Sequence, residues 1–165
     1  MHVYCMNKLQ IVKLIGLIIL CEIVGAIGTI FTAPNIPTWY ASLAKPFFNP
    51  PNWLFAPAWT TLFLLMGISL YLLLENKEMK LKLVKKIALV LFIVQFIFNI
   101  LWSYLFFGLR NPLLGLIGII ILWILILATI VSFYKVDKRG AYLLIPYLLW
   151  VTFATVLNFS IFILN

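Results

Sequence analysis

Five long apolar runs dominate the pattern of hydrophobic and polar positions along the chain. They cover residues 9–31, 53–74, 87–107, 113–133 and 141–164. A helix of about 20 apolar residues is long enough to cross the hydrocarbon core of a bilayer. The pattern therefore predicts an all-α integral membrane protein, in which residues 1–165 form a single domain built as a five-transmembrane-helix bundle.

Composition supports this prediction. Of the 165 residues, 65% are hydrophobic and 10% are charged, and the mean hydropathy is +1.17. A water-soluble domain of this length could not carry such a composition on its surface. A cleavable signal peptide is the alternative interpretation of the first run, although Glu22 and the continuation to Phe31 favour a span. Cys5 and Cys21 are not expected to form a disulfide, since one precedes this span and the other lies inside it.

The 12 basic residues fall almost entirely in alternate connections. All except Lys45 and Arg110 lie before or at the start of the first run (Lys8 and Lys13) or in the second and fourth connections. By the positive-inside rule, the N-terminus is cytoplasmic, and the first loop and the C-terminus lie outside what we expect to be a prokaryotic cell membrane. The net charge of +8 therefore indicates orientation, and we expect no nucleic-acid partner.

The first connection, residues 32–52, is the longest. Three prolines in its second half remove backbone donors and favour extended geometry, which predicts an ordered loop from Trp39 onward. Long loops in compact proteins are often functional, so we interpret this one as a lid. The alternative is that Trp39, Tyr40 and Phe47 only anchor the loop at the lipid headgroups. Asn52 is expected to cap the helix that follows.

Glu22 is the only acidic residue inside a run. Gly25, Ala26 and Thr29 follow it at helical offsets of three, four and seven, so the four residues share one face. A carboxylate at membrane depth should face the bundle or water, which suggests a site for proton or cation coupling. The alternative is a carboxyl that hydrogen-bonds a neighbouring helix. If Glu22 couples proton movement to transport, the chain would be a small proton-coupled multidrug-type exporter, which is our alternative function.

Amide and indole side chains recur at one depth in three of the runs. They are Trp59 in the second run, Asn99 and Trp102 in the third, and Trp150 and Asn158 in the fifth, where Ala154 shares their stripe. Gln95 lies on the same helical stripe as Asn99 and Trp102. Flat indole walls with few polar groups are typical of a small-molecule cavity. The alternative is that the amides join neighbouring helices and the indoles fill the core.

Specific motifs strengthen this interpretation. They are Trp39-Tyr40, Leu43-x-Lys45-Pro46, Asn49-Pro50-Pro51-x-Trp53-x-Phe55-x-Pro57-x-Trp59, Met66-Gly67-Ile68-Ser69-x-Tyr71, Gln95-x-x-x-Asn99-x-x-Trp102 and Pro146-Tyr147-Leu148-x-Trp150. With these motifs the chain resembles the TspO/MBR family of tryptophan-rich sensory and translocator proteins over nearly its whole length. The resemblance implies a five-helix bundle, commonly a homodimer, that binds porphyrins such as protoporphyrin IX and other flat hydrophobic ligands beneath the first loop.

The resemblance also implies site residues and a role. The implied ligand-binding positions are Trp39, Trp59, Asn99, Trp102, Trp150, Ala154 and Asn158. The implied role is sensing, sequestration or transport of a tetrapyrrole, with no required cofactor and no metal. A light-dependent degradation of porphyrin, ascribed to some members, would correspond to Trp59 and Trp150. A conventional enzyme is not favoured, because the only histidine is His2 and the sequence shows no carboxylate pair or metal-ligand cluster.

Two positions depart from the family pattern. The residues after Leu157 contain neither the tyrosine nor the basic residue of the sterol-recognition pattern found in animal members, so sterol binding there is not expected. Several members also carry an acidic residue in the fourth span, where this chain has Gly118. No role that depends on that acid is carried over.

Overall fold

The computed structural model describes residues 7–165, and the predictions for His2 and Cys5 lie outside them. The six α-helices in this part are α1 (Lys8–Thr32), α2 (Phe55–Glu75), α3 (Lys82–Ser103), α4 (Pro112–Tyr134), α5 (Lys138–Leu143) and α6 (Ile145–Leu164). Within residues 7–165, five helical segments are long and apolar enough to cross a membrane. The predicted all-α, five-span class is confirmed.

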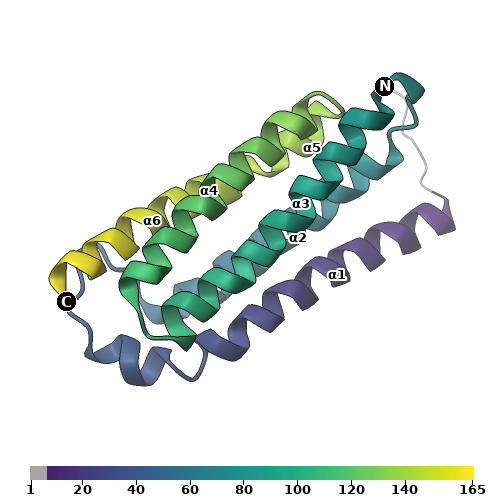
Figure 1. The fold of residues 1–165 in the computed structure, drawn as a ribbon. Helices are drawn as coiled ribbons and strands as arrows, with labels where there is room; N and C mark the ends of the chain where they lie inside the picture. The colour runs from purple at the N-terminus through teal and green to yellow at the C-terminus, as the bar shows by residue number, and fades with distance from the viewer. Residues whose placement is uncertain (1–6) are drawn as a thin grey trace.

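The helices form one elongated bundle (Figure 1). Helix α1 packs against α2 and α3, α3 packs against α4, and α4 packs against α5 and α6, while α5 also contacts α2. Helix α1 begins at the end of the bundle opposite to the end where α6 finishes, and the connection from α1 to α2 lies beside the end of α6 (Figure 1). We call this the lid end and the other the basic end.

Helices α5 and α6 together form the fifth span, with a break at Leu144 that the apolar pattern did not predict. Pro146 has no N–H group, and its ring would collide with the carbonyl of Tyr142 in a continuous helix. The chain instead closes a tighter turn, in which the Leu144 N–H donates to the Ala141 carbonyl (3.1 Å). The break therefore has a local cause in one proline.

The starts of the helices follow local chemistry. Asn111 caps α4, because its Oδ1 accepts a hydrogen bond from the Leu114 N–H (3.0 Å). Asp137 caps α5 through the backbone N–H groups of its first turn. Partial burial alone would raise the pKa of Asp137, but hydrogen bonds from Arg139 and from the backbone lower it overall. The prediction for Asn52 was wrong: Pro51 is the capping residue of a 3₁₀ turn, and the Asn52 side chain makes no capping hydrogen bond.

The lid, residues 33–51, contains a short helical segment that the sequence interpretation missed. The segment η1 (Ile36–Tyr40) is a π-helical turn, closed by a hydrogen bond from the Tyr40 N–H to the Asn35 carbonyl (2.8 Å). The prolines of the lid stand before and after residues 38–42, so these residues keep their backbone donors. The expectation of an extended loop holds only for the proline-rich second half.

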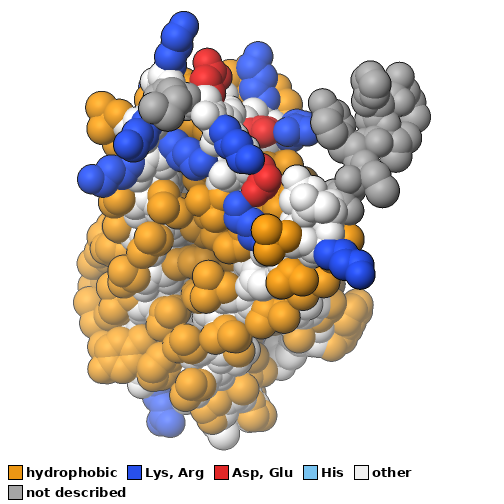
Figure 2. All heavy atoms as spheres, turned by 90° about the vertical axis from the view of Figure 1, so that its right-hand side faces the viewer, with side chains coloured by type: hydrophobic (Ala, Val, Ile, Leu, Met, Phe, Trp, Pro, Cys, Tyr) orange, Lys and Arg blue, Asp and Glu red, His pale blue; other side chains and the backbone are white. Residues whose placement is uncertain are grey.

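Charge is distributed unequally over the bundle. Figure 2 shows Lys, Arg, Asp and Glu side chains gathered over the basic end, above a wide belt of hydrophobic side chains. At that end Lys13 forms an ion pair with Glu75, and the Lys85 ammonium donates to the carbonyls of Leu74 and Asn76. The apolar belt matches a surface that faces lipid, since many of its large side chains are exposed.

Candidate functional site

A cavity of about 410 Å³ lies between α1, α2 and α3 beneath η1. Its α1 wall runs from Glu22 to Thr32 and includes the face of Gly25, Ala26 and Thr29 that the sequence singled out. The first turns of α2 and the last turns of α3 form the other walls, and Ile36 and Tyr40 cover the cavity from the lid. The size and the mainly apolar lining are typical of small-molecule sites.

Three of the seven predicted ligand-binding residues line this cavity. Trp59 comes from α2, and Asn99 and Trp102 come from α3. The remaining four residues are not part of its lining, and they are Trp39, Trp150, Ala154 and Asn158. The sequence assigned the cavity to the second, third and fifth spans, whereas the structure forms it from the first three.

Trp59 stands at the centre of an aromatic cluster. Its ring stacks on Phe63 (centroids 5.8 Å apart) and lies 6.2 Å from Trp102. Behind it, Trp150 meets the Trp59 ring nearly at right angles, with the centroids 6.5 Å apart. Trp150 therefore supports the wall that Trp59 forms. Such edge-to-face contacts hold a ring in one orientation more firmly than burial alone does.

The two buried asparagines of the long helices, Asn99 and Asn158, hydrogen-bond neighbouring helices. The Asn99 Nδ2 group donates to the hydroxyl of Tyr147 (2.9 Å), which joins α3 to α6, and Asn99 also lines the cavity. The Asn158 Nδ2 group donates to the Pro112 carbonyl at 3.4 Å, which joins α6 to α4. Asn158 therefore fits the alternative interpretation as a link between helices, and Asn99 fits both interpretations.

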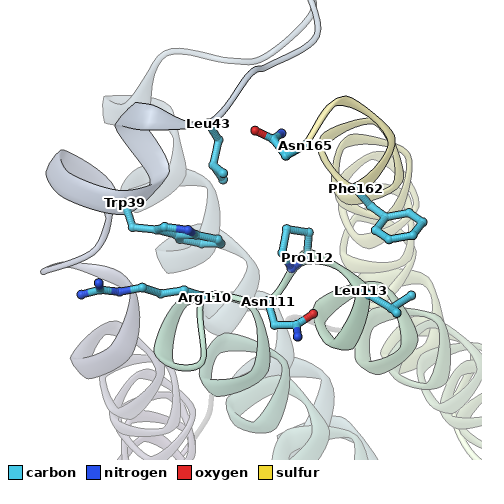
Figure 3. A pocket seen from close by; sticks show the side chains of 8 residues that line it. All are labelled: Trp39, Leu43, Arg110, Asn111, Pro112, Leu113, Phe162 and Asn165. Carbon is cyan, nitrogen blue, oxygen red and sulfur yellow. The ribbon is translucent and has the colours of Figure 1, made fainter.

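Trp39 lines a second, smaller pocket of about 310 Å³ at the lid end. Figure 3 shows Trp39 and Leu43 of the lid facing Pro112 and Phe162, while the Arg110 guanidinium extends away from them. The Trp39 ring also packs against Phe106 at a centroid distance of 5.3 Å. Trp39 thus packs the lid against the segment that follows α3 and does not line the central cavity.

The lid has one polar contact within itself and is attached to the rest of the chain by polar contacts at two places. The Tyr40 hydroxyl donates to Asn49 Oδ1 (2.6 Å), and the Arg110 Nε group donates to Asn35 Oδ1 (3.1 Å). The Asn165 amide both accepts from the Ala44 N–H (3.0 Å) and donates to the Ala44 carbonyl (3.1 Å). These contacts hold the segment as an ordered cover.

The two interpretations of the lid aromatics apply to different residues. Tyr40 is 2% exposed and covers the cavity, and this burial raises its pKa to about 12. Phe47 is fully exposed, as expected of a headgroup anchor.

Sequence reasoning missed several residues that shape the cavity. Phe55 and Phe63 lie one helical turn before and after Trp59, so their spacing of four residues could have identified them. Gly28 approaches α3 closely, because a Cβ atom there would lie 3.2 Å from the Ser103 Oγ atom. The pattern gave no signal for this contact, since it depends on how two helices pack.

Comparison with known proteins gives one consistent result. The model of the TspO/MBR family matches residues 17–164. The chain is 48% identical to the tryptophan-rich protein TspO of Archaeoglobus fulgidus, over 95% of this chain and 99% of the relative. It is 45% identical to the protein of the same name from Chlorobaculum tepidum, over 97% and 99%. The translocator protein of Bos taurus is 34% identical, over 90% of this chain and 87% of the relative.

Proposed function

Because the chain belongs to the TspO/MBR family, we propose that it is a membrane receptor or carrier for porphyrins and related flat hydrophobic molecules. The ligand occupies the central cavity beneath the lid. Binding there serves sensing, sequestration or transport, and the protein acts as a homodimer. It lies in the cell membrane with the basic end in the cytoplasm and the lid outside.

One observation carries this proposal: a cavity of about 410 Å³ is walled by aromatic rings at membrane depth and covered by an ordered lid. Trp59, Phe63 and Trp102 present faces on which a planar ring system can stack. The few polar side chains among them can orient a ligand without making the site hydrophilic. Tyr40 closes the cavity at the lid end. A ligand would enter from this end, past the lid.

The test is a titration of the purified protein with protoporphyrin IX, followed by the absorbance of the porphyrin. We expect saturable binding, and we expect Trp102→Leu to weaken it at least tenfold, which corresponds to ~1.4 kcal/mol. Gly25→Leu should abolish binding by filling the cavity, since even a Cβ atom there would lie 2.4 Å from the Phe63 ring.

Gly16→Leu is the matched control, because a Cβ atom at this α1 position has nothing within 4 Å. Equal affinity in the Gly25→Leu and Gly16→Leu proteins would place the ligand elsewhere. Absence of saturation in the unmodified protein would contradict the proposed function itself.

A second candidate function is favoured by the position of Glu22 on the cavity wall. A carboxyl beside the ligand could couple binding to proton movement, as in a small exporter. In that case Glu22→Gln should abolish proton-driven efflux from vesicles and leave porphyrin binding intact. Efflux that is independent of the proton gradient would exclude this candidate.

Light-dependent degradation of the bound porphyrin is a possible extension of the main proposal. Trp59 lines the cavity and Trp150 lies directly behind it, with ring centroids 6.5 Å apart. A porphyrin in the cavity would absorb the light, dissolved O₂ would be the oxidant, and the two indoles are oxidisable groups beside the porphyrin. Illumination of the complex should then bleach the porphyrin, and replacement of either tryptophan by phenylalanine should slow the bleaching. Equal bleaching rates in all three proteins would contradict this assignment.

A further inference from the structure

Glu22 places a carboxyl group at the end of the central cavity that is farthest from the lid. It is half-buried, and it begins the α1 wall, which continues to Thr32. Among the described residues, no Lys or Arg lines the cavity, and Tyr40 at the opposite end is its only other titratable side chain. The two ion pairs of the described chain, Lys13 with Glu75 and Arg139 with Asp137, both lie outside the cavity.

Within residues 7–165, Glu22 has no ion-pair partner, and a carboxylate at this depth would need one. An unpaired charge near hydrocarbon is costly, and a cation brought to it offsets much of that cost. The aromatic walls of the cavity also favour a cationic ligand, because the rings of Phe63, Trp59 and Trp102 have electron-rich faces. Aromatic faces attract organic cations, and do so more strongly where water is excluded.

We infer that the inner end of the cavity recognises the positively charged nitrogen of flat organic cations, with Glu22 as the counter-ion. This inference rests on the proposed function, since it concerns the same cavity. It also sets an orientation: a ligand places cationic groups toward Glu22 and anionic groups toward the lid. A porphyrin would therefore bind with its carboxylates directed away from Glu22.

The inference is tested with two fluorescent probes of nearly equal shape. N-methylacridinium carries a permanent positive charge, and acridine is uncharged at mildly alkaline pH. Both are titrated into the protein in uncharged detergent micelles, with empty micelles subtracted. We expect the unmodified protein to prefer the cation by about tenfold or more. Glu22→Gln should remove this preference by weakening only the cation, with acridine affinity unchanged.

Glu75→Gln is the matched control, because it removes a carboxylate at the basic end, outside the cavity. This variant should keep the full preference for the cation. Protoporphyrin IX, titrated into the Glu22→Gln protein, should bind as tightly as before or more tightly, since a negative charge near the ligand has been removed. Tighter or equal porphyrin binding also shows that the variant is folded.

The possible failures are distinguishable. Equal affinities for the two acridines in the unmodified protein, or a preference that survives Glu22→Gln, would overturn the inference while the porphyrin result stands. A clear preference that depends on Glu22, together with no saturable binding of protoporphyrin IX, would support the inference and contradict the proposed function.

Discussion

Gly67 sets the distance between α1 and α2, and its replacement by alanine gives a sharp test of the packing. A Cβ atom at this position would lie 2.6 Å from the Cα atom of Ile18 and 3.0 Å from its backbone nitrogen. Ordinary contacts of this kind begin near 3.4 Å. Because the obstacle is backbone, no change of side-chain rotamer relieves it, and α1 must move away from α2 by about 0.8 Å (3.4 minus 2.6).

The expected cost follows from this displacement. Overpacking of a tight contact typically costs about 1–3 kcal/mol, and the better helix propensity of alanine returns up to about 1 kcal/mol. We therefore expect Gly67→Ala to lower the free energy of unfolding by about 1–2 kcal/mol. Helix α1 is also a wall of the cavity, so ligand affinity should change as well.

The assay is unfolding in mixed micelles of increasing SDS content, followed by tryptophan fluorescence. Gly16→Ala is the matched control: it makes the same substitution on α1, at a position with nothing within 4 Å, and it should leave the free energy of unfolding unchanged or raise it slightly. If Gly67→Ala were as stable as Gly16→Ala, the close approach of α1 to α2 would be wrong.

Three further predictions follow from individual contacts. Asp137→Ala should lower the free energy of unfolding by about 1 kcal/mol, because α5 loses its capping side chain. Asn52→Ala should leave it unchanged, because the Asn52 side chain makes no capping hydrogen bond. Thermal unfolding of the two variants measures the difference. Tyr40 has a raised pKa, so the protein binds its proton more tightly when folded. The stability it contributes should be present below about pH 10 and be lost as the pH rises to about 12. A Tyr40→Phe protein should lose this dependence in unfolding measured against pH. Asn165→Ala should speed hydrogen exchange of the Ala44 amide, which would no longer have its acceptor.

The fold class could be predicted because hydrophobicity alone determines which segments enter a bilayer. Charge in the connections and the length of each run gave five spans without any knowledge of packing. The break at Leu144 was missed because it depends on how one proline, Pro146, restricts its neighbours. The helical turn at η1 was missed because residues 38–42 keep their backbone donors between the prolines of the lid. The Asn52 prediction failed because Pro51 took the capping position.

The site was predicted less completely than the fold. Residues on one helix could be grouped by periodicity, which correctly placed Glu22 and Thr29 on one face and Asn99 with Trp102 on another. Periodicity does not say which helices are neighbours, and this limit explains why the residues predicted on the fifth span do not line the central cavity. Trp150 lies at the expected depth but behind Trp59. Only the packing of α1 against α2 and α3 decides which faces enclose space.

Helix α1 is less buried in the bundle than the other spans are. We therefore expect that the position of α1 controls the shape of the cavity, and that the core of the other spans controls most of the stability. Only 11% of the apolar window of α1 is buried, against 28–44% in the others. Its close contacts are made where it or its partner has glycine, as at Gly67 and Gly28.

By contrast, Leu122 of α4 is fully buried in the main core, and it does not line the cavity. Leu122→Ala should therefore cost about 2–5 kcal/mol of stability yet leave ligand affinity unchanged. Compared with Leu122→Ala, Gly67→Ala should lower the free energy of unfolding less and change the affinity for the ligand more. Parallel losses of affinity in both variants, measured by the same porphyrin titration, would show that the cavity is not controlled by the position of α1.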